Sequence, residues 1–141
     1  MTPVMALESI NHQGSPLMTN PDSFFHITHL DQVAIVTLKR DKKCSAINGA
    51  MRNALIDTQQ AVNADDAFGA VVLTGAGSSF CAGGDIGSMR ERLEAPRGRV
   101  GSNGWKRQKQ THRLISTIYH MEKPVTAAVN GAAIFNYAED R

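Results

Sequence analysis

Three short apolar and β-branched runs, separated by segments of helical character, constrain the fold of this chain more than any other feature. They occupy residues 33–38 (VAIVTL), 70–74 (AVVLT) and 124–129 (PVTAAV). Nearly continuous apolar runs of this length are typical of strands that are covered on both faces, as in a parallel sheet. The pattern predicts an α/β fold in which helices join neighbouring strands through right-handed crossovers.

In the stretches between these runs, apolar residues recur at helical spacing. Asn48 is expected to cap a helix over residues 49–63, because its side-chain oxygen can accept from free N–H groups and apolar residues then follow at helical spacing. A short helix is expected over 86–93 with Asp85 near its start, and a longer one over 105–121. The side chains expected to face the core from the longer helix are Leu114, Ile115, Ile118 and Tyr119.

Turns and loops are expected at three places. Asp31 and Gln32 follow a short strand over residues 24–28 and predict a tight turn before the first apolar run. Residues 75–79 (GAGSS) predict a flexible loop, and residues 96–104, with three glycines and one proline, predict a mobile connection.

Length and composition exclude several classes of protein. A chain of 141 residues with 42% apolar and 20% charged residues fits one globular domain. A net charge of +2 is too small to favour nucleic acid or a membrane surface as partner, and no apolar run is long enough to span a bilayer. No Lys or Arg precedes Lys39, so we expect no signal peptide and a cytoplasmic location. The expected division is a flexible tail over 1–21, a domain over 22–134 and a divergent C-terminal end over 135–141.

Residues 80–85 (FCAGGD) carry the chemistry that the sequence predicts. They follow the second apolar run, and open α/β sheets bind ligands beyond the carboxyl ends of their strands. Adjacent glycines let a ligand approach the backbone, and the start of a helix leaves N–H groups unpaired. These groups suit a developing oxyanion. The alternative is a glycine-rich turn that only joins a strand to a helix.

Other kinds of site do not match. The glycines at 75 and 77 lack the third glycine of the dinucleotide fingerprint, and the sequence contains neither a Gly-Lys-Ser/Thr phosphate loop nor a Gly-x-Ser-x-Gly elbow. His and Cys residues show no metal-ligand spacing, so no metal is expected. A run of basic residues without an acid suggests either contacts with phosphate groups or a solvated helix face. Its members are Arg97, Arg99, Lys106, Arg107, Lys109 and Arg113.

Four blocks resemble one known family. The blocks VAIVTLKR, SAIN, AVVLTGAGSSFCAGGDI and KPVTAAVNGAA occur in the order and spacing of the enoyl-CoA hydratase/isomerase (crotonase) superfamily, over about residues 24 to 134. The resemblance implies the N-terminal part of a crotonase-like (ClpP/crotonase) fold built from repeated ββα units, truncated before the C-terminal helical part. It also implies an oxyanion hole whose first amide belongs to Gly84. The positions it implies for binding coenzyme A are Ser45, Ala46, Cys81, Ala82 and Gly84.

The resemblance weakens after Ile134. The family places a glycine triplet there, whereas this chain continues with residues 135–141 (FNYAEDR) and stops. Aligned without gaps, the second amide falls at Asn136, and Glu139 falls where hydratases carry their first catalytic glutamate. We interpret the ending as a frameshifted or truncated gene product, or as a genuine short form with another role.

The resemblance implies an enzyme that stabilises a thioester enolate, as in the degradation of fatty or aromatic acyl groups. The alternative is a catalytically weak or inactive remnant that only binds acyl-CoA or associates with other subunits. No permanently bound cofactor is expected, because coenzyme A arrives as part of the substrate. The family forms trimers or hexamers, so the resemblance implies a homo-oligomer for a full-length member.

Overall fold

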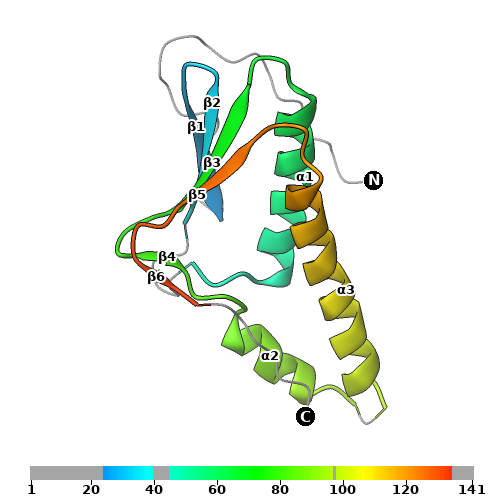
Figure 1. Cartoon of the computed structure of the whole chain (residues 1–141). Coiled ribbons are helices and arrows are strands. Elements are labelled where there is room, and N and C mark those ends of the chain that lie inside the picture. The colour runs from blue at the N-terminus through cyan, green and yellow to red at the C-terminus, as the bar shows by residue number, and fades with distance from the viewer. Residues whose placement is uncertain (1–23, 40–44, 97, 135–141) are drawn as a thin grey trace.

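The computed structural model describes residues 24–39, 45–96 and 98–134, so the predicted tail and divergent C-terminal end lie outside the described residues. The described part is an α/β arrangement, as the sequence predicted (Figure 1). Its elements in chain order are β1 (Phe25–Leu30), β2 (Val33–Leu38), α1 (Gly49–Ala64), β3 (Ala70–Gly75), β4 (Ser79–Cys81), α2 (Ile86–Leu93), α3 (Val100–Tyr119), β5 (Val125–Ala128) and β6 (Ala132–Ala133).

The main sheet has the strand order β1-β2-β3-β5. β1 and β2 are antiparallel and meet at the predicted turn, where Asp31 has a φ of 49°. β2, β3 and β5 are parallel, which confirms the predicted parallel arrangement. Helices α1 and α3 lie on the same side of this sheet (Figure 1). β4 and β6 form a second, smaller parallel sheet beyond the end of β3.

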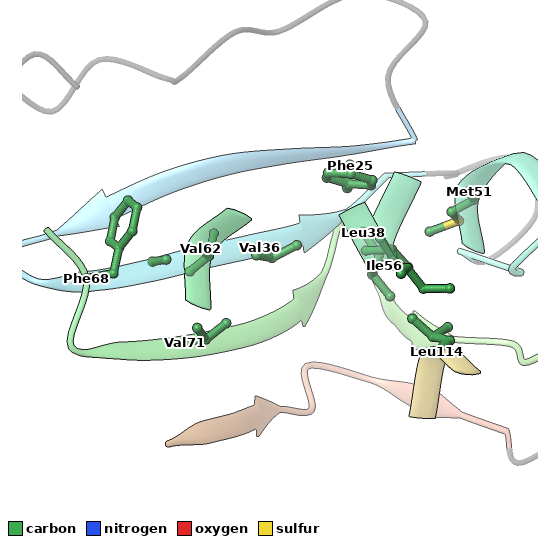
Figure 2. Packing of buried hydrophobic residues seen from close by; sticks show 11 residues of the cluster. Phe25, Val36, Leu38, Met51, Ile56, Val62, Phe68, Val71 and Leu114 are labelled. Atoms are coloured by element: carbon green, nitrogen blue, oxygen red, sulfur yellow. The ribbon is translucent and has the colours of Figure 1, made fainter. Parts of the chain in front are cut away.

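The core lies between the main sheet and α1, with one contribution from α3. Alternate residues of β2 are buried at Ala34, Val36 and Leu38, whereas the residues between them are only half-buried. The expectation that this strand is covered on both faces is therefore wrong, because the described helices lie along one face only. Figure 2 shows the side chains that gather in this core. They include Phe25, Val36, Leu38, Met51, Ile56, Val62, Phe68, Val71 and Leu114.

Both ends of α1 are fixed by side chains. Asn48 caps the start as predicted, and its Oδ1 accepts from the Met51 N–H at 2.8 Å. At the other end, the ammonium group of Lys123 donates to the carbonyl oxygens of Val62, at 2.7 Å, and of Asp65. A cation suits the negative end of the helix dipole, and Lys123 thereby ties α1 to the segment that precedes β5.

The second half of the chain departs from prediction in three ways. α3 begins at Val100 instead of residue 105, so much of the expected mobile connection is helical. On α3, Leu114 is buried as expected, but Ile115 is 58% exposed and Tyr119 is 83% exposed. β5 is also largely exposed, because it is an edge strand in the described sheet and no described element covers its outer face.

Two kinds of feature are absent from the described part of the chain. None of the helices there has the length and hydropathy to cross a bilayer. The same residues contain no group of three His, Cys, Asp or Glu side chains that could hold a metal ion.

Candidate functional site

The predicted loop lies where β3 meets β4. A Cβ on Gly75 would come within 2.2 Å of the Ser79 carbonyl oxygen, so only glycine lets β4 pass this close to the end of β3. β4 then leads directly into residues 82–85 and the first turn of α2. The loop thus lies beyond the carboxyl end of a parallel strand, as the sequence predicted. The short strands β4 and β6 were missed, because three and two residues are too few to show a period.

A single parallel bridge joins the loop to the segment that precedes α1. The Ile47 N–H donates to the Gly83 carbonyl at 2.7 Å, and the Asp85 N–H donates to the Ile47 carbonyl at 3.2 Å. This bridge pairs Ile47 with Gly84 and brings two segments side by side that are far apart in the sequence. The structure therefore brings together the five positions predicted to bind coenzyme A, which are Ser45, Ala46, Cys81, Ala82 and Gly84.

The bridge also determines which way the Gly84 amide points. In a parallel ladder, the peptides on either side of a residue bond to the partner strand, so the residue's own N–H points away from that strand. Here the neighbouring Gly83 carbonyl and Asp85 N–H take those bonds to Ile47. Within the described part of the chain, the Gly84 N–H has no hydrogen-bond acceptor.

The Cys81 side chain stabilises the loop through two hydrogen bonds. Its Sγ accepts from the Gly83 N–H at 3.4 Å and donates to the Ser45 carbonyl at 3.5 Å. Burial raises the pKa of the Cys81 thiol, and the Gly83 N–H acts in the opposite direction. A thiol kept neutral is a poor nucleophile, which favours a packing role for the Cys81 side chain.

Two residues of this region have a backbone in the left-handed region. Gly83 has a φ of 77°, which glycine adopts without strain. Ser45 has a φ of 55°, which a side chain adopts less readily. Ser45 is 1% exposed, and its hydroxyl donates to the Leu38 carbonyl at 3.3 Å, which ties this turn to the end of β2.

Asp85, which was expected near the start of this helix, caps α2. Its Oδ1 accepts from the Ser88 N–H at 3.0 Å, and the residue is 4% exposed. The carboxylate therefore serves as the N-cap of α2 and stabilises the positive end of its dipole.

Asn130 directly follows the third apolar run of the sequence, and its side chain positions the loop. Its Oδ1 accepts from the Gly75 N–H at 3.0 Å and its Nδ2 donates to the Gly77 carbonyl at 2.9 Å. These bonds fix the turn before β4 against the end of β5. An Asn-Gly pair is typical of a local turn, so nothing in the sequence predicted that Asn130 contacts the segment at Gly75 and Gly77.

The predicted positions in the second half of the site, Asn136 and Glu139, lie outside the described residues. Of the predicted basic run, Lys106 and Arg107 line a pocket between the helices together with Arg52 of α1. Sequence reasoning missed Arg52, because a lone arginine inside an amphipathic helix is typical of a solvated face.

Comparison with known proteins identifies the family. Residues 28–135 match the family described as Enoyl-CoA hydratase/isomerase. This chain belongs to the enoyl-CoA hydratase/isomerase family. Among curated relatives, it is 30% identical over 118 residues to 4-chlorobenzoyl coenzyme A dehalogenase-1 of an Arthrobacter species, which covers 84% of this chain and 42% of the relative. It is 36% identical over 105 residues to crotonyl-CoA hydratase of Syntrophomonas wolfei, which covers 74% of this chain and 38% of the relative.

The solved structures confirm the fold. The Pseudomonas aeruginosa protein PA4980 superposes with a TM-score of 0.72 at 34% identity, over 82% of this chain and 47% of that one. The predicted crotonase-like fold is therefore correct for this enoyl-CoA hydratase/isomerase family member. The chain spans about two fifths of the length of the curated relatives that it matches, namely 42% and 38% of the two described above.

Proposed function

We propose that this chain forms the N-terminal part of an acyl-CoA site in which the Gly84 N–H donates to the carbonyl oxygen of a thioester. The observation that carries this proposal is the bridge between Ile47 and Gly84, which turns the Gly84 N–H away from the neighbouring segment. The same N–H lies just before the first turn of α2, where the helix dipole favours negative charge.

The chemistry follows from the placement of this donor. When a proton leaves the carbon next to a thioester, or water adds to a conjugated double bond, negative charge accumulates on the carbonyl oxygen. A fixed N–H aimed at that oxygen stabilises the enolate more than the ground state. One such donor lowers the barrier by roughly 3 kcal/mol. The family member would thus catalyse hydration or isomerisation of an acyl-CoA, with the other groups of the site supplied by residues outside the described part.

The coenzyme A portion would lie along the two bridged segments. Ser45 and Ala46 precede the bridge on one segment, and Cys81 and Ala82 precede it on the other. Two relatives have printed names that specify acyl-CoA chemistry, a 4-chlorobenzoyl coenzyme A dehalogenase and a crotonyl-CoA hydratase. Both support coenzyme A thioesters as the class of substrate.

Binding without turnover is the second candidate function. Asp85 is the acid nearest in sequence to Gly84, and it is engaged as the cap of α2. The described residues therefore offer a donor for the carbonyl oxygen, whereas the carboxylate that follows it in the sequence already serves α2. Association of subunits through the exposed faces of β5 and α3 belongs to the same candidate, and sedimentation equilibrium would measure it.

Infrared spectroscopy of bound crotonyl-CoA, labelled with ¹³C at the thioester carbonyl, tests the donor directly. A hydrogen bond from Gly84 should lower the carbonyl stretching frequency below its value in water, and Gly83→Ala should reverse that shift because it displaces the loop. Gly87→Ala, which makes the same change on an exposed turn of α2, is the matched control. A bound thioester with its solution frequency would refute the proposal, and turnover measured on the same samples decides between the two candidates.

A further inference from the structure

Three arginines from three different helices meet in one pocket. The pocket has a volume of about 240 Å³ and lies between α1, α2 and α3, which contribute Arg52, Arg92 and Arg107. Ile47 and Asn48 form part of its wall, so it adjoins the segment that carries the bridge to Gly84.

Arg52 is far more buried than a solvated charge would be, and Arg92 and Arg107 are half-buried. Arg52 is only 4% exposed, and the one hydrogen bond of its guanidinium group runs from Nη1 to the Gln110 Oε1 at 3.2 Å. Arg92 extends from α2 to α3, where a Cβ on Gly104 would lie 3.7 Å from its Nη1. The Arg92 Nε is buried and has no hydrogen-bond partner among the described residues. A guanidinium group has five N–H donors, so the partly exposed ends of Arg92 and Arg107 also offer donors to a ligand in the pocket.

No negative charge compensates these groups within residues 24–39, 45–96 and 98–134, where the structure records no ion pair to any of the three arginines. Burial, and after it the charge of Arg107, lowers the pKa of Arg52. Burial, and after it the charge of Arg92, lowers the pKa of Arg107. Guanidinium groups nonetheless stay charged at neutral pH, so the pocket concentrates positive charges that repel one another.

We propose that Arg52, Arg92 and Arg107 bind one small oxyanion, a phosphate or a carboxylate group, in this pocket. Planar guanidinium groups match the oxygen pairs of both groups, and three of them from separate helices can surround one anion. The anion satisfies the unpaired donors and removes the mutual repulsion. This site is separate from the contact at Gly84 and does not depend on the proposed function.

Titration of the whole chain with inorganic phosphate, followed by calorimetry and by thermal unfolding, tests the proposal. Phosphate should bind saturably and raise the Tm, because a ligand that binds only the folded state stabilises it. Arg107→Gln should weaken phosphate binding about tenfold or more, the effect of losing hydrogen bonds to a charged group. Without phosphate, the same change should raise the Tm, because it removes one of the repelling charges.

The control is Arg90→Gln, which removes the same charge from an exposed position of α2 outside the pocket. It should alter phosphate affinity by less than about twofold, as expected of distant exposed charges. Arg92→Gln and Arg107→Lys provide variants in case Arg107→Gln does not fold, and both should weaken binding. Absence of saturable binding overturns the proposal, as does an equal effect of Arg90→Gln and the pocket variants.

Competition experiments then assign the source of the oxyanion. Displacement of phosphate by coenzyme A but not by dephospho-coenzyme A assigns the pocket to the 3′-phosphate. Displacement by glutarate but not by coenzyme A assigns it to a carboxylate. Phosphate that neither compound displaces supports the proposal for the free ion.

Discussion

The two helices that lie on the same side of the main sheet differ sharply in what they bury. α1 buries Met51 completely against β2, where Val36 is only 2% exposed. On α3, Tyr119 is 83% exposed, and directly after β5 Val129 is 58% exposed. Both regions carry apolar residues in regular elements. The difference teaches that an apolar pattern in the sequence marks a surface that is stabilised by burial, but does not identify the element that buries it.

The largest expected effect on stability compares a buried position in β2 with an exposed position on α3. Leu38→Ala should lower the free energy of unfolding by about 3 kcal/mol, because Leu38 is 2% exposed and its loss leaves a cavity. Ile115→Ala removes a similar volume from a position that is 58% exposed and should change stability by less than about 0.5 kcal/mol. Urea unfolding of both variants measures the contrast. Equal losses would mean that another surface covers α3 in solution.

A smaller effect on stability is expected when glycine is replaced in the loop, and the opposite effect in the helix that follows it. Gly83→Ala should destabilise the chain by about 1–2 kcal/mol, because Gly83 has a φ of 77°. Gly87→Ala, on an exposed turn of α2, should instead stabilise it by up to about 1 kcal/mol, because alanine favours helix. The same assay measures both variants, and a shared sign would show that the left-handed backbone at Gly83 is not required.

The cap of α2 should contribute somewhat less. Asp85→Ala should lower stability by about 1 kcal/mol, because the Ser88 N–H loses its acceptor. Asp85→Asn keeps a side-chain oxygen in the same place and should lose less. Circular dichroism during urea unfolding measures both changes, and an Asn variant as unstable as the Ala variant would show that the negative charge matters more than the hydrogen bond.

The smallest effect concerns the Cys81 thiol. Because burial raises its pKa, alkylation by iodoacetamide in a Cys44→Ser background should require a higher pH in the folded chain than in urea. The raised pKa also determines how the stability of the chain changes with pH. The stabilisation from the neutral thiol is complete below the ordinary thiol pKa and is lost as the pH rises through the raised pKa. The stability advantage over Cys81→Ser should therefore shrink at alkaline pH, and an advantage that grew with pH would contradict the assignment.

The sequence predicted those features that depend on neighbouring residues. The parallel strands, the Asn48 cap, the short helix after Asp85 and the loop at Gly84 all rest on local patterns. It failed for features that depend on distant partners. β4 and β6 are recognisable only because they pair with each other, and the exposure of Tyr119 depends on which elements lie beside α3.

The candidate sites show the same division. The family motif placed the positions that are predicted to bind coenzyme A, and the structure brings both of their segments together through Ile47. The arginine pocket could not be predicted in this way, because Arg52, Arg92 and Arg107 lie on separate helices and no spacing relates them. Only the arrangement of the three helices shows that their charges converge.

The bridge between Ile47 and Gly84 has a consequence for folding. It closes a loop that contains all of α1 and β3, so the entropy of that closure must be overcome before the two segments can meet. A peptide that spans only residues 80–86 lacks the partner segment and cannot adopt the bridged geometry. Hydrogen exchange at the Ile47 amide should therefore report the cooperative opening of the whole α1–β3 unit and not a local fluctuation of the loop.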